Sequence, residues 1–376
     1  MSTSARHYLD HASTSPPRPE AVAAARAWLE EPGGDPGRIH REGMASRVAL
    51  EEARAAVAEL LGARPREVVL TSGATEAIAA ACWGAAERGA HQVLTAVEHS
   101  AVRLSAAAHG EVTVVGVDAD GRVDPGDLLA AVRPDTALVH LQWGNHEVGT
   151  LQPVAEVVGA CRERGVAVHV DAAQAAGRVP IDFDELGADL LSVSAHKLGG
   201  LPGTGALLVR RGLRLRPLLA GGDQERARRA GMEHVLGAVA FGAACTALLS
   251  GGLDHEADRQ RRLRDRILAE VGALDGTRVY GDPAGGLPHL ACFGVDDVEP
   301  QAVLLGLDRA GLAVHSGSAC ASEGLEPSPV LEAMGVDAHH SLRISVGWSS
   351  TDADADALAN ALPPVLAELR ALAARG

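Results

Sequence analysis

Lysine is almost absent from this chain of 376 residues. Lys197 is the only lysine among the 34 basic residues, and all the others are arginine. A coding bias toward Ala, Gly, Arg and Pro accounts for such a skew, because arginine replaces lysine wherever only a surface charge is needed. A guanidinium, however, stays protonated and cannot act as an amine nucleophile. The surviving lysine therefore has two explanations: chance, or a reaction that needs an unprotonated amine.

The balance of charge and the spacing of the cysteines argue against a nucleic-acid-binding protein, a disulfide-stabilised protein and a metal-binding protein. The 34 basic residues stand against 49 acidic ones, and the net charge of −15 argues against direct nucleic-acid binding. The cysteines are odd in number and form no CxxC pair, so neither a disulfide framework nor a metal site is expected. They are Cys82, Cys161, Cys245, Cys292 and Cys320.

Long apolar runs are missing as well. The first ten residues, MSTSARHYLD, hold no apolar run typical of a secretory signal. The longest apolar stretch, 238–249, is too short to span a bilayer. We therefore expect no membrane insertion and a cytoplasmic location.

The segment from about 65 to 210 alternates short β-branched runs with Ala-rich helical patterns. This alternation predicts an α/β fold with a mostly parallel sheet covered on both faces. A long helix, a Gly/Pro-rich stretch and a mixed segment follow after about 240, and they predict a smaller α+β domain. The strand candidates are 67–73, 91–99, 111–118, 136–144, 166–174, 188–197 and 204–211, and helical patterns include 75–88, 125–132 and 153–164.

Polar residues stand at the ends of several predicted strands. Ligands of open parallel sheets bind at the carboxyl ends of the strands. Lys197 stands at such an end, which favours a chemical reason for its survival. The other polar groups there are Thr71-Ser72-Gly73, Glu98-His99, Asn145-His146, Asp171 with Gln174, and Ser194 with His196.

Three of these strand ends together suit a phosphorylated aldehyde cofactor. The run SGATEA (72–77) places a Gly turn and Thr75 at a helix N-terminus, which either binds an anion or is an ordinary N-cap. Asp171 follows a buried strand, where it either pairs with a cation such as a protonated pyridine nitrogen or caps the next helix. Ser194 and His196 precede Lys197, and an amine beside phosphate donors and opposite a buried carboxylate is what a Schiff base with pyridoxal 5'-phosphate (PLP) requires.

Two further residues are candidates for handling a substrate. SGSAC (316–320) predicts a loop of small residues, in which Cys320 is either a nucleophile, if its pKa is lowered, or an inert thiol. Arg343 begins a short strand in LRISVG, where it either clamps a carboxylate or pairs with a structural acid.

The order and spacing of these motifs resemble the NifS-like cysteine desulfurases of group I. The resemblance runs from about residue 8 to 350 and implies a fold-type I PLP-dependent transferase: a large domain with a mostly parallel seven-stranded sheet and a smaller α+β domain. The family implies 14–240 for the large domain, and 1–13 with 241–376 for the small one. The motifs are YLDHAST, TSGATEA, EHSAV, NHEVGTLQPV, HVDAAQAAGRVPIDF, SAHKLGG, GGDQERARRAG, HSGSACASEGLEPSPVL and LRISVGW.

The resemblance also implies roles for matching residues at the cofactor. Lys197 would form the Schiff base and later move protons. Asp171 would pair with the pyridine nitrogen, and Gln174 would contact the ring oxygen. His99 would stack on the ring and take part in proton transfer. The phosphate would be held by Ala74, Thr75, Ser194 and His196.

For the substrate, the resemblance implies L-cysteine bound through Arg343, with Asn145 nearby. Cys320 would take the sulfur as a persulfide, alanine would be released, and an acceptor protein of unspecified identity would then receive the sulfur. The family further implies a homodimer in which GGDQERARRAG, with Arg226 and Arg229, lies near the neighbouring site. Selenocysteine as a substrate stays open.

Four positions depart from the family pattern. His146 replaces the second Asn of NNEVG, which contacts the ring oxygen, and a neutral imidazole can still donate one hydrogen bond there. Met232 replaces a Thr that binds the neighbouring subunit's phosphate, and losing that bond costs about 1 kcal/mol. His234 and Asp35 replace two Asn residues. These departures concern cofactor retention and activity rather than the fold.

Two other functions remain as alternatives to a cysteine desulfurase. One is another PLP-dependent reaction on an amino acid, a lyase or epimerase in which Cys320 is idle. The other is a non-catalytic paralogue that serves as a sulfur-relay or assembly partner.

Overall fold

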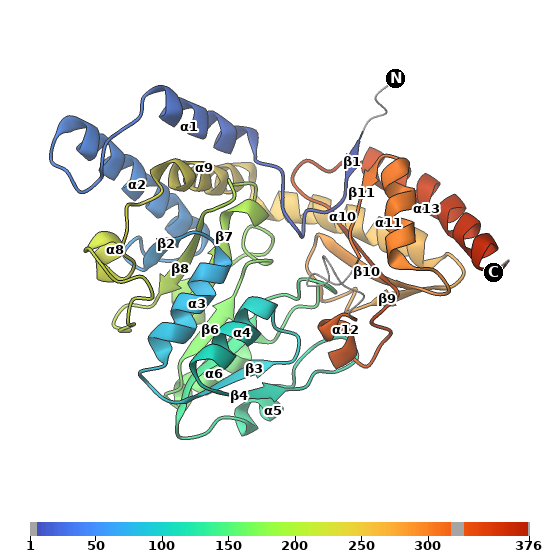
Figure 1. Cartoon of the computed structure of the whole chain (residues 1–376), viewed down its shortest axis with the longest axis horizontal. Helices are drawn as coiled ribbons and strands as arrows, with labels where there is room; N and C mark the ends of the chain where they lie inside the picture. Colours follow the sequence, from blue (N-terminus) through green and yellow to red (C-terminus); the bar gives the residue numbers. More distant parts are fainter. Residues whose placement is uncertain (1–5, 317–326, 375–376) are drawn as a thin grey trace.

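A seven-stranded sheet forms the centre of the larger part of the chain (Figure 1). The structure is a computed structural model that describes residues 6–316 and 327–374. The strand order is β2-β8-β7-β6-β5-β3-β4, and only β8 runs antiparallel to its neighbours. The strands are β2 (Val68–Thr71), β3 (His91–Thr95), β4 (Glu111–Val115), β5 (Thr136–Gln142), β6 (Val168–Asp171), β7 (Leu190–Ser194) and β8 (Gly205–Val209). The predicted mostly parallel seven-stranded sheet is therefore confirmed.

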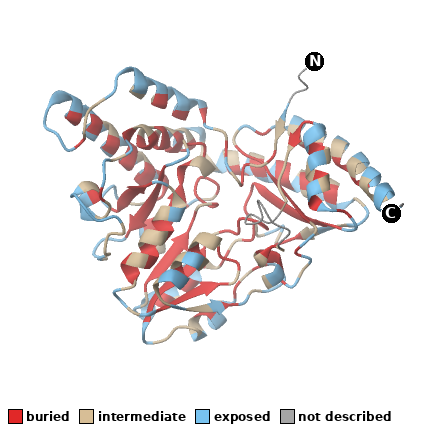
Figure 2. Ribbon diagram, viewed as in Figure 1, coloured by how far each residue is buried: buried red, intermediate tan, exposed pale blue. Residues whose placement is uncertain are grey.

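Helices cover both faces of this sheet, so its strands are buried (Figure 2). On one face α2, α5, α6 and α9 pack against side chains such as Val139 and Leu191. On the other face α3 and α4 pack against Leu94, Leu138 and Leu190. The helices of this part are α1 (Pro19–Glu30), α2 (Arg41–Leu60), α3 (Ala74–Ala85), α4 (Ser100–His109), α5 (Pro125–Ala130), α6 (Val154–Glu163), α7 (Phe183–Leu186), the 3₁₀ turn η1 (Ala195–Lys197), α8 (Gln224–Ala227) and α9 (Val235–Gly251).

A smaller antiparallel sheet lies beside the first and has its own core. Its order is β12-β10-β9, and β1 near the N-terminus pairs in parallel with β11. Its core joins Leu9 to Phe293, Ile344 and residues of the last helix. The elements are β1 (His7–Tyr8), α10 (Leu253–Gly272), β9 (Thr277–Tyr280), β10 (Leu290–Val295), α11 (Pro300–Arg309), β11 (Leu312–Ala313), α12 (Pro329–Ala333), β12 (Ser341–Ser345) and α13 (Asp352–Ala373).

The division expected between residues 240 and 241 falls inside α9. Phe241, Cys245 and Leu248 of that helix pack in the same core as the seven-stranded sheet. The chain turns at Gly252, whose φ of 78° ends α9 and begins α10. Since α9 packs in the core of the large sheet on both sides of residue 240, the packing favours a domain division at Gly252, where α9 ends.

The helices of the described ranges include none that is by itself long and apolar enough to cross a membrane. The adjoining helices α9 and α10 meet the criteria of length and composition only as a pair, and they are bent by 83° at their junction.

A buried ion pair ties α2 to α8. Arg54 donates to both carboxylate oxygens of Glu225 at 2.6 and 2.8 Å, and each side chain is only 2% exposed. Glu225 also accepts from the backbone N–H of Leu70 on β2. The three residues 225–227 have φ between 48° and 60°, a left-handed conformation that non-glycine residues rarely adopt. The ion pair therefore holds a strained turn against the sheet.

We predict that Arg54→Met lowers the free energy of unfolding by about 3–5 kcal/mol, because it leaves Glu225 buried without its partner. Arg64→Met is the matched control, since Arg64 pairs with Asp184 at the surface, where such pairs contribute about 0–1 kcal/mol. Urea unfolding of the two variants measures both values. Equal losses would contradict the importance of the buried pair.

Candidate active site

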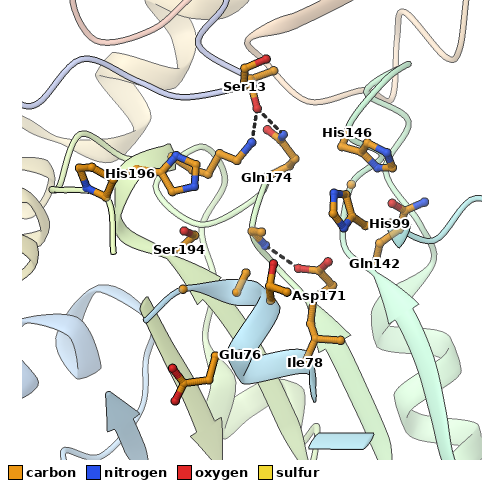
Figure 3. Close-up of a pocket in the computed structure, with 18 of the residues that line it drawn as sticks. Ser13, Glu76, Ile78, His99, Gln142, His146, Asp171, Gln174, Ser194 and His196 are labelled. Carbon is orange, nitrogen blue, oxygen red and sulfur yellow. Dashed lines mark hydrogen bonds between the residues drawn. The ribbon is translucent and has the colours of Figure 1, made fainter. Parts of the chain in front are cut away.

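A cavity of about 490 Å³ opens at the carboxyl ends of the large sheet's strands (Figure 3). It is lined by the β2–α3 turn, the ends of β5 and β6, the β7–η1 turn, the N-terminal segment and β12. The predicted site residues that line it are Ala74, Thr75, His99, His146, Asp171, Gln174, Ser194, His196, Lys197 and Arg343. The structure thus gathers residues that are up to 269 positions apart in the sequence, from Ala74 to Arg343.

The N-terminus of α3 forms one wall of the cavity. Gly73 caps the helix with φ of 154°, and a Cβ on Gly205 would lie 2.6 Å from the Cα of Gly73. Glycine is therefore needed at both position 73 and position 205, where β8 passes the β2–α3 turn. The free N–H groups of a helix N-terminus favour an anion. Ser194 and His196 line the same wall.

His196 is a neutral member of this wall. Burial and the nearby Lys197 lower the pKa of His196 to about 4. Its Nδ1 lies 3.1 Å from the hydroxyl of Thr14. A neutral imidazole with one N–H can donate to a phosphate oxygen without carrying charge.

Glu76 brings a negative charge to the first turn of α3. Burial alone would raise the pKa of Glu76, but hydrogen bonds from Arg229 and Ser72 lower it instead. Arg229 Nε lies 2.9 Å from Glu76 Oε1, and the Ser72 N–H donates to Glu76 Oε2 at 2.8 Å. Arg229 thus neutralises the carboxylate nearest to the anion-binding turn.

Lys197 ends the η1 turn with its amine directed into the cavity. Nζ donates to the carbonyl oxygen of Ala12, which also accepts from Gln174 Nε2 at 2.8 Å. Burial, and after it the charge of Arg343, lowers the pKa of Lys197 to about 7. In a large fraction of the molecules the amine of Lys197 is therefore unprotonated near neutral pH, as an amine nucleophile must be.

Asp171 lies at the end of β6, across the cavity from Lys197. Its Oδ1 accepts from the backbone N–H of Ala173 at 3.0 Å and lies 3.3 Å from the hydroxyl of Ser192. Burial raises the pKa of Asp171. The described part of the chain offers this carboxylate no salt-bridge partner, so a cation bound in the cavity could pair with it.

Glu98, next to His99, carries no charge at neutral pH. It is 1% exposed, and burial raises its pKa to about 8. Its Oε1 accepts from the N–H of Gln142 and from Thr95 Oγ1. Glu98 therefore does not compete with Asp171 for a cation bound in the cavity.

His99 is the N-cap of α4, and its ring meets His146 edge-to-face with centroids 5.0 Å apart. Its Nδ1 accepts from the backbone N–H of Ala101 at 3.1 Å. Burial, and after it the neighbouring His146 and Lys197, lowers the pKa of His99 to about 3. A neutral imidazole that accepts at Nδ1 carries its proton on Nε2. His99 can therefore donate a hydrogen bond into the site.

Arg343 is held by three partners at the rim between the two sheets. Its terminal nitrogens donate to Asp10 at 3.0 Å, to Ser13 Oγ at 2.6 Å and to the carbonyl oxygen of His146 at 2.9 Å. Its buried Nε has no partner within the described residues. An arginine fixed in this way, with two of its five N–H groups unused, is suited to binding a carboxylate.

Two of the expected site residues are not placed in the cavity. Asn145 is fully buried, and its Oδ1 accepts from the N–H groups of Glu147 and Val148 while Nδ2 donates to Val97. The asparagine caps its own turn, and its contact with substrate stays a prediction. Cys320 lies outside the described residues.

The other four cysteines are buried. Burial raises the pKa of Cys82 to about 12 and that of Cys161 to about 11. Burial likewise raises the pKa of Cys245 and Cys292. None of these four thiols is suited to nucleophilic attack, since the thiolate is the reactive form.

Sequence reasoning missed several cavity residues. Asp10 and Ser13 position Arg343, and both lie in YLDHAST, a motif noted only as a whole. Gln142 and His315 also line the cavity. His315 opens HSGSACASEGLEPSPVL, another motif noted only as a whole. Gln142 follows no recognisable pattern, because its place depends on which strands become neighbours.

The segment expected to reach a neighbouring subunit contacts its own chain here. Arg229 pairs with Glu76, and Arg226 pairs with Glu51 at 3.2 Å. Met232 is 65% exposed. The role of this segment at another subunit's site stays a prediction.

The two remaining departures from the family pattern make local contacts. His234 Nδ1 lies 3.4 Å from Thr204 Oγ1, and Asp35 accepts from the N–H of Gly37 at 2.8 Å. Their effects on cofactor retention stay predictions. Across 6–316 and 327–374, no three His, Cys, Asp or Glu side chains come together in a way that could hold a metal ion.

Comparisons with known proteins agree with this geometry. The class-V aminotransferase family matches residues 7–358. A cysteine desulfurase of Cereibacter sphaeroides is 42% identical, and the alignment covers 99% of this chain and 98% of that protein. A NifS-like protein of known structure has a TM-score of 0.88 and 29% identity, covering 99% of this chain and 100% of that one. SspA, solved in complex with cysteine, has a TM-score of 0.79 and 28% identity, covering 90% and 98%.

The chain belongs to the class-V aminotransferase family, whose fold and site chemistry it shares. Members of this branch of the family depend on PLP. Within the family the chain belongs with the NifS-like cysteine desulfurases, and the fold, cofactor and activity expected from the sequence are confirmed.

The residues present fit the cofactor. The N-terminus of α3 with Ser194 and His196 suits a phosphate, and the unprotonated amine of Lys197 suits an aldehyde. The buried carboxylate of Asp171, which lacks an ion-pair partner in the described chain, suits a protonated pyridine nitrogen.

We predict that Gly205→Ala raises the dissociation constant for PLP roughly tenfold or more, because the new Cβ displaces the Gly73 turn. Equilibrium dialysis of the cofactor-free protein measures this constant. Gly159→Ala on α6 is the control, since its Cβ meets nothing within 4 Å. Unchanged binding in Gly205→Ala would show that the turn does not hold the phosphate.

Proposed function

We propose that this cavity removes the sulfur of L-cysteine, with the single lysine as its central residue. The observation that carries the proposal is the amine of Lys197, with a pKa of about 7, facing the same cavity as Asp171 and Arg343. In the net reaction, L-cysteine and an enzyme thiol give L-alanine and an enzyme persulfide. The C–S bond of the substrate and the S–H bond of the enzyme thiol break, an S–S bond and a C–H bond at the β-carbon form, and no external oxidant is needed because the β-carbon is reduced as the sulfur is oxidised.

Each residue of the cavity has one task in this proposal. When bound, PLP supplies an electron sink that weakens the bonds around the α-carbon of the substrate. Lys197 bonds the aldehyde and afterwards holds or releases a proton at Nζ. Asp171 accepts a hydrogen bond from the pyridine nitrogen and keeps it protonated. The α3 N-terminus with Thr75 binds the phosphate.

The residues along the other side of the cavity position the ring and the substrate. Gln174 Nε2 has a second hydrogen, beyond the one given to Ala12, that can reach the ring oxygen. His146 lines the same region and can donate one hydrogen bond to that oxygen. His99 donates through Nε2, and the guanidinium of Arg343, which lines the cavity, binds the substrate carboxylate.

Cys320 is the thiol that receives the sulfur in this proposal, and the persulfide is then passed to an acceptor protein. The support comes from elimination among the cysteines. The other four are buried with pKa values raised by burial, so none of them can serve. The SspA relative solved with cysteine supports cysteine as the substrate.

We also propose that the chain forms a homodimer. Large apolar side chains are exposed along the segment from α1 to α2 and in the loop before α9, where a monomer would leave them in water. They are Leu29 at 65%, Ile39 at 91%, Val48 at 52% and Met232 at 65% exposure.

The pH dependence of PLP capture tests the role of Lys197. Only the unprotonated amine bonds the aldehyde, so the rate is expected to rise with increasing pH through about 7 and then to level off. Visible absorbance after mixing PLP with cofactor-free protein measures the rate. Lys197→Ala should show no capture by any side chain, since the sequence has no other lysine. A midpoint near the ordinary lysine value of 10.5 would contradict an active, buried amine.

Cys320→Ser tests the destination of the sulfur. We expect alanine formation from cysteine to fall roughly 10³-fold or more, with PLP binding unchanged, because the attacking thiolate is lost. Cys161→Ser is the matched control and should keep full activity. Mass spectrometry after incubation with ³⁵S-cysteine should place the persulfide on the peptide of Cys320. Alanine formation at the unmutated rate would favour a different PLP-dependent reaction with Cys320 idle.

A further inference from the structure

A row of buried polar side chains crosses four adjacent strands and ends on Asp171. Gln92 on β3, His140 on β5, His169 on β6 and Ser192 on β7 are each at most 1% exposed. His140 Nε2 lies 2.7 Å from Gln92 Oε1, and the two imidazole Nδ1 atoms are 3.0 Å apart. His169 Nε2 lies 3.1 Å from Ser192 Oγ, which lies 3.3 Å from Asp171 Oδ1. Two imidazoles are costly to bury unless their hydrogen bonds are made.

Strand register brings this row together. His140 and His169 are partners on neighbouring parallel strands, and Asp171 and Ser192 are partners one step farther along. Because side chains alternate across a strand, His169 and Asp171 point to the same face. That face is the one covered by α3 and α4. The row therefore connects the interior of the sheet to the carboxylate in the cavity.

The hydrogen bonds of this row must all point the same way. Burial lowers the pKa of His140 to about 3 and holds that of His169 well below its ordinary value, so both rings are neutral and each carries one N–H. In the contact between the two Nδ1 atoms, one ring donates and the other accepts. The ring that donates in this contact carries its proton on Nδ1 and must accept at Nε2. The ring that accepts there carries its proton on Nε2 and must donate from it.

Only two arrangements satisfy every contact. In the first, Gln92 donates to His140, His140 Nδ1–H to His169, His169 Nε2–H to Ser192, and the Ser192 hydroxyl to Asp171. In the second, every direction is reversed, and Asp171 must carry a proton to donate to Ser192. The Gln92 amide suits either arrangement, because rotating it by 180° exchanges its oxygen and nitrogen.

We propose that this row, Gln92-His140-His169-Ser192, is a hydrogen-bond relay that stabilises the ionised form of Asp171 and so strengthens cofactor binding. Among the described residues, Asp171 has only the Ala173 N–H and the Ser192 hydroxyl as hydrogen-bond donors and forms no salt bridge. The direction of the Ser192 hydroxyl therefore decides how well its charge is supported. His140, His169 and Ser192 are positioning residues, since they act through Asp171. The inference rests on the proposed role of Asp171 at the pyridine nitrogen.

Nitrogen-15 NMR of protein labelled at histidine reads the direction of the relay. With PLP bound, Asp171 is ionised, and we expect His140 to carry its proton on Nδ1 and His169 on Nε2. The variants His140→Asn and His169→Asn assign the two sets of signals. The opposite pair of tautomers in the PLP-bound protein would overturn the relay.

Cofactor affinity provides a second measurement, made in a Lys197→Ala background so that no covalent bond to PLP contributes. We expect Ser192→Ala to raise the dissociation constant for PLP about tenfold, as for the loss of a hydrogen bond to a charged group. Cys245→Ala is the control: this thiol is also buried but lies on α9, away from the row, so binding should change less than twofold. Unchanged binding in Ser192→Ala would overturn the proposal.

Asp171→Asn separates a failure of the relay from a failure of the proposed function. If Asp171→Asn weakens PLP binding and Ser192→Ala does not, the relay is wrong while the role of Asp171 stands. If neither variant weakens binding, the pairing of Asp171 with the pyridine nitrogen is itself wrong, and the relay falls with it.

Discussion

The whole site depends on the hydrogen bonds made by the backbone of Ala12. Its carbonyl oxygen accepts from Lys197 and from Gln174, and its N–H donates to Ser345 on the small sheet at 2.8 Å. Two residues earlier, Asp10 holds Arg343. A short N-terminal segment thus joins the amine on the large sheet to the carboxylate-binding arginine on the small one. Because backbone groups make most of these bonds, the two halves of the site are held at a fixed separation.

Burial determines the chemistry of the groups that surround this contact. It lowers the pKa of Lys197 to about 7 and raises the pKa of Glu98 to about 8, so an amine and a carboxyl that would be charged in water are largely neutral here. It also keeps His99 and His196 neutral. Asp171 and Arg343 are the two groups proposed to meet the ionised parts of cofactor and substrate. The same desolvation that disfavours charge elsewhere makes these two interactions stronger.

Much of the large sheet was predictable because its strands are short, β-branched and separated by helical periodicity. Each of the seven candidate runs holds one strand, and the helical patterns at 75–88, 125–132 and 153–164 became α3, α5 and α6 with shifted ends. The place of α9 was not predictable in this way. Its residues are apolar all round, so the sequence did not show that both α2 and the large sheet would bury it. The expected domain division was therefore placed inside it.

The sequence by itself determined the members of the site that stand at strand ends, namely Lys197, Asp171, Thr75 and Ser194, since the carboxyl ends of parallel strands meet at one edge. It also determined that only one side-chain amine exists. Tertiary structure alone decided that Asn145 turns inward, that Asp10 holds Arg343, and that His140 lies against His169. These contacts join residues far apart in the chain, or depend on which strands pair and in what register, and a pattern of neighbouring residues carries neither kind of information.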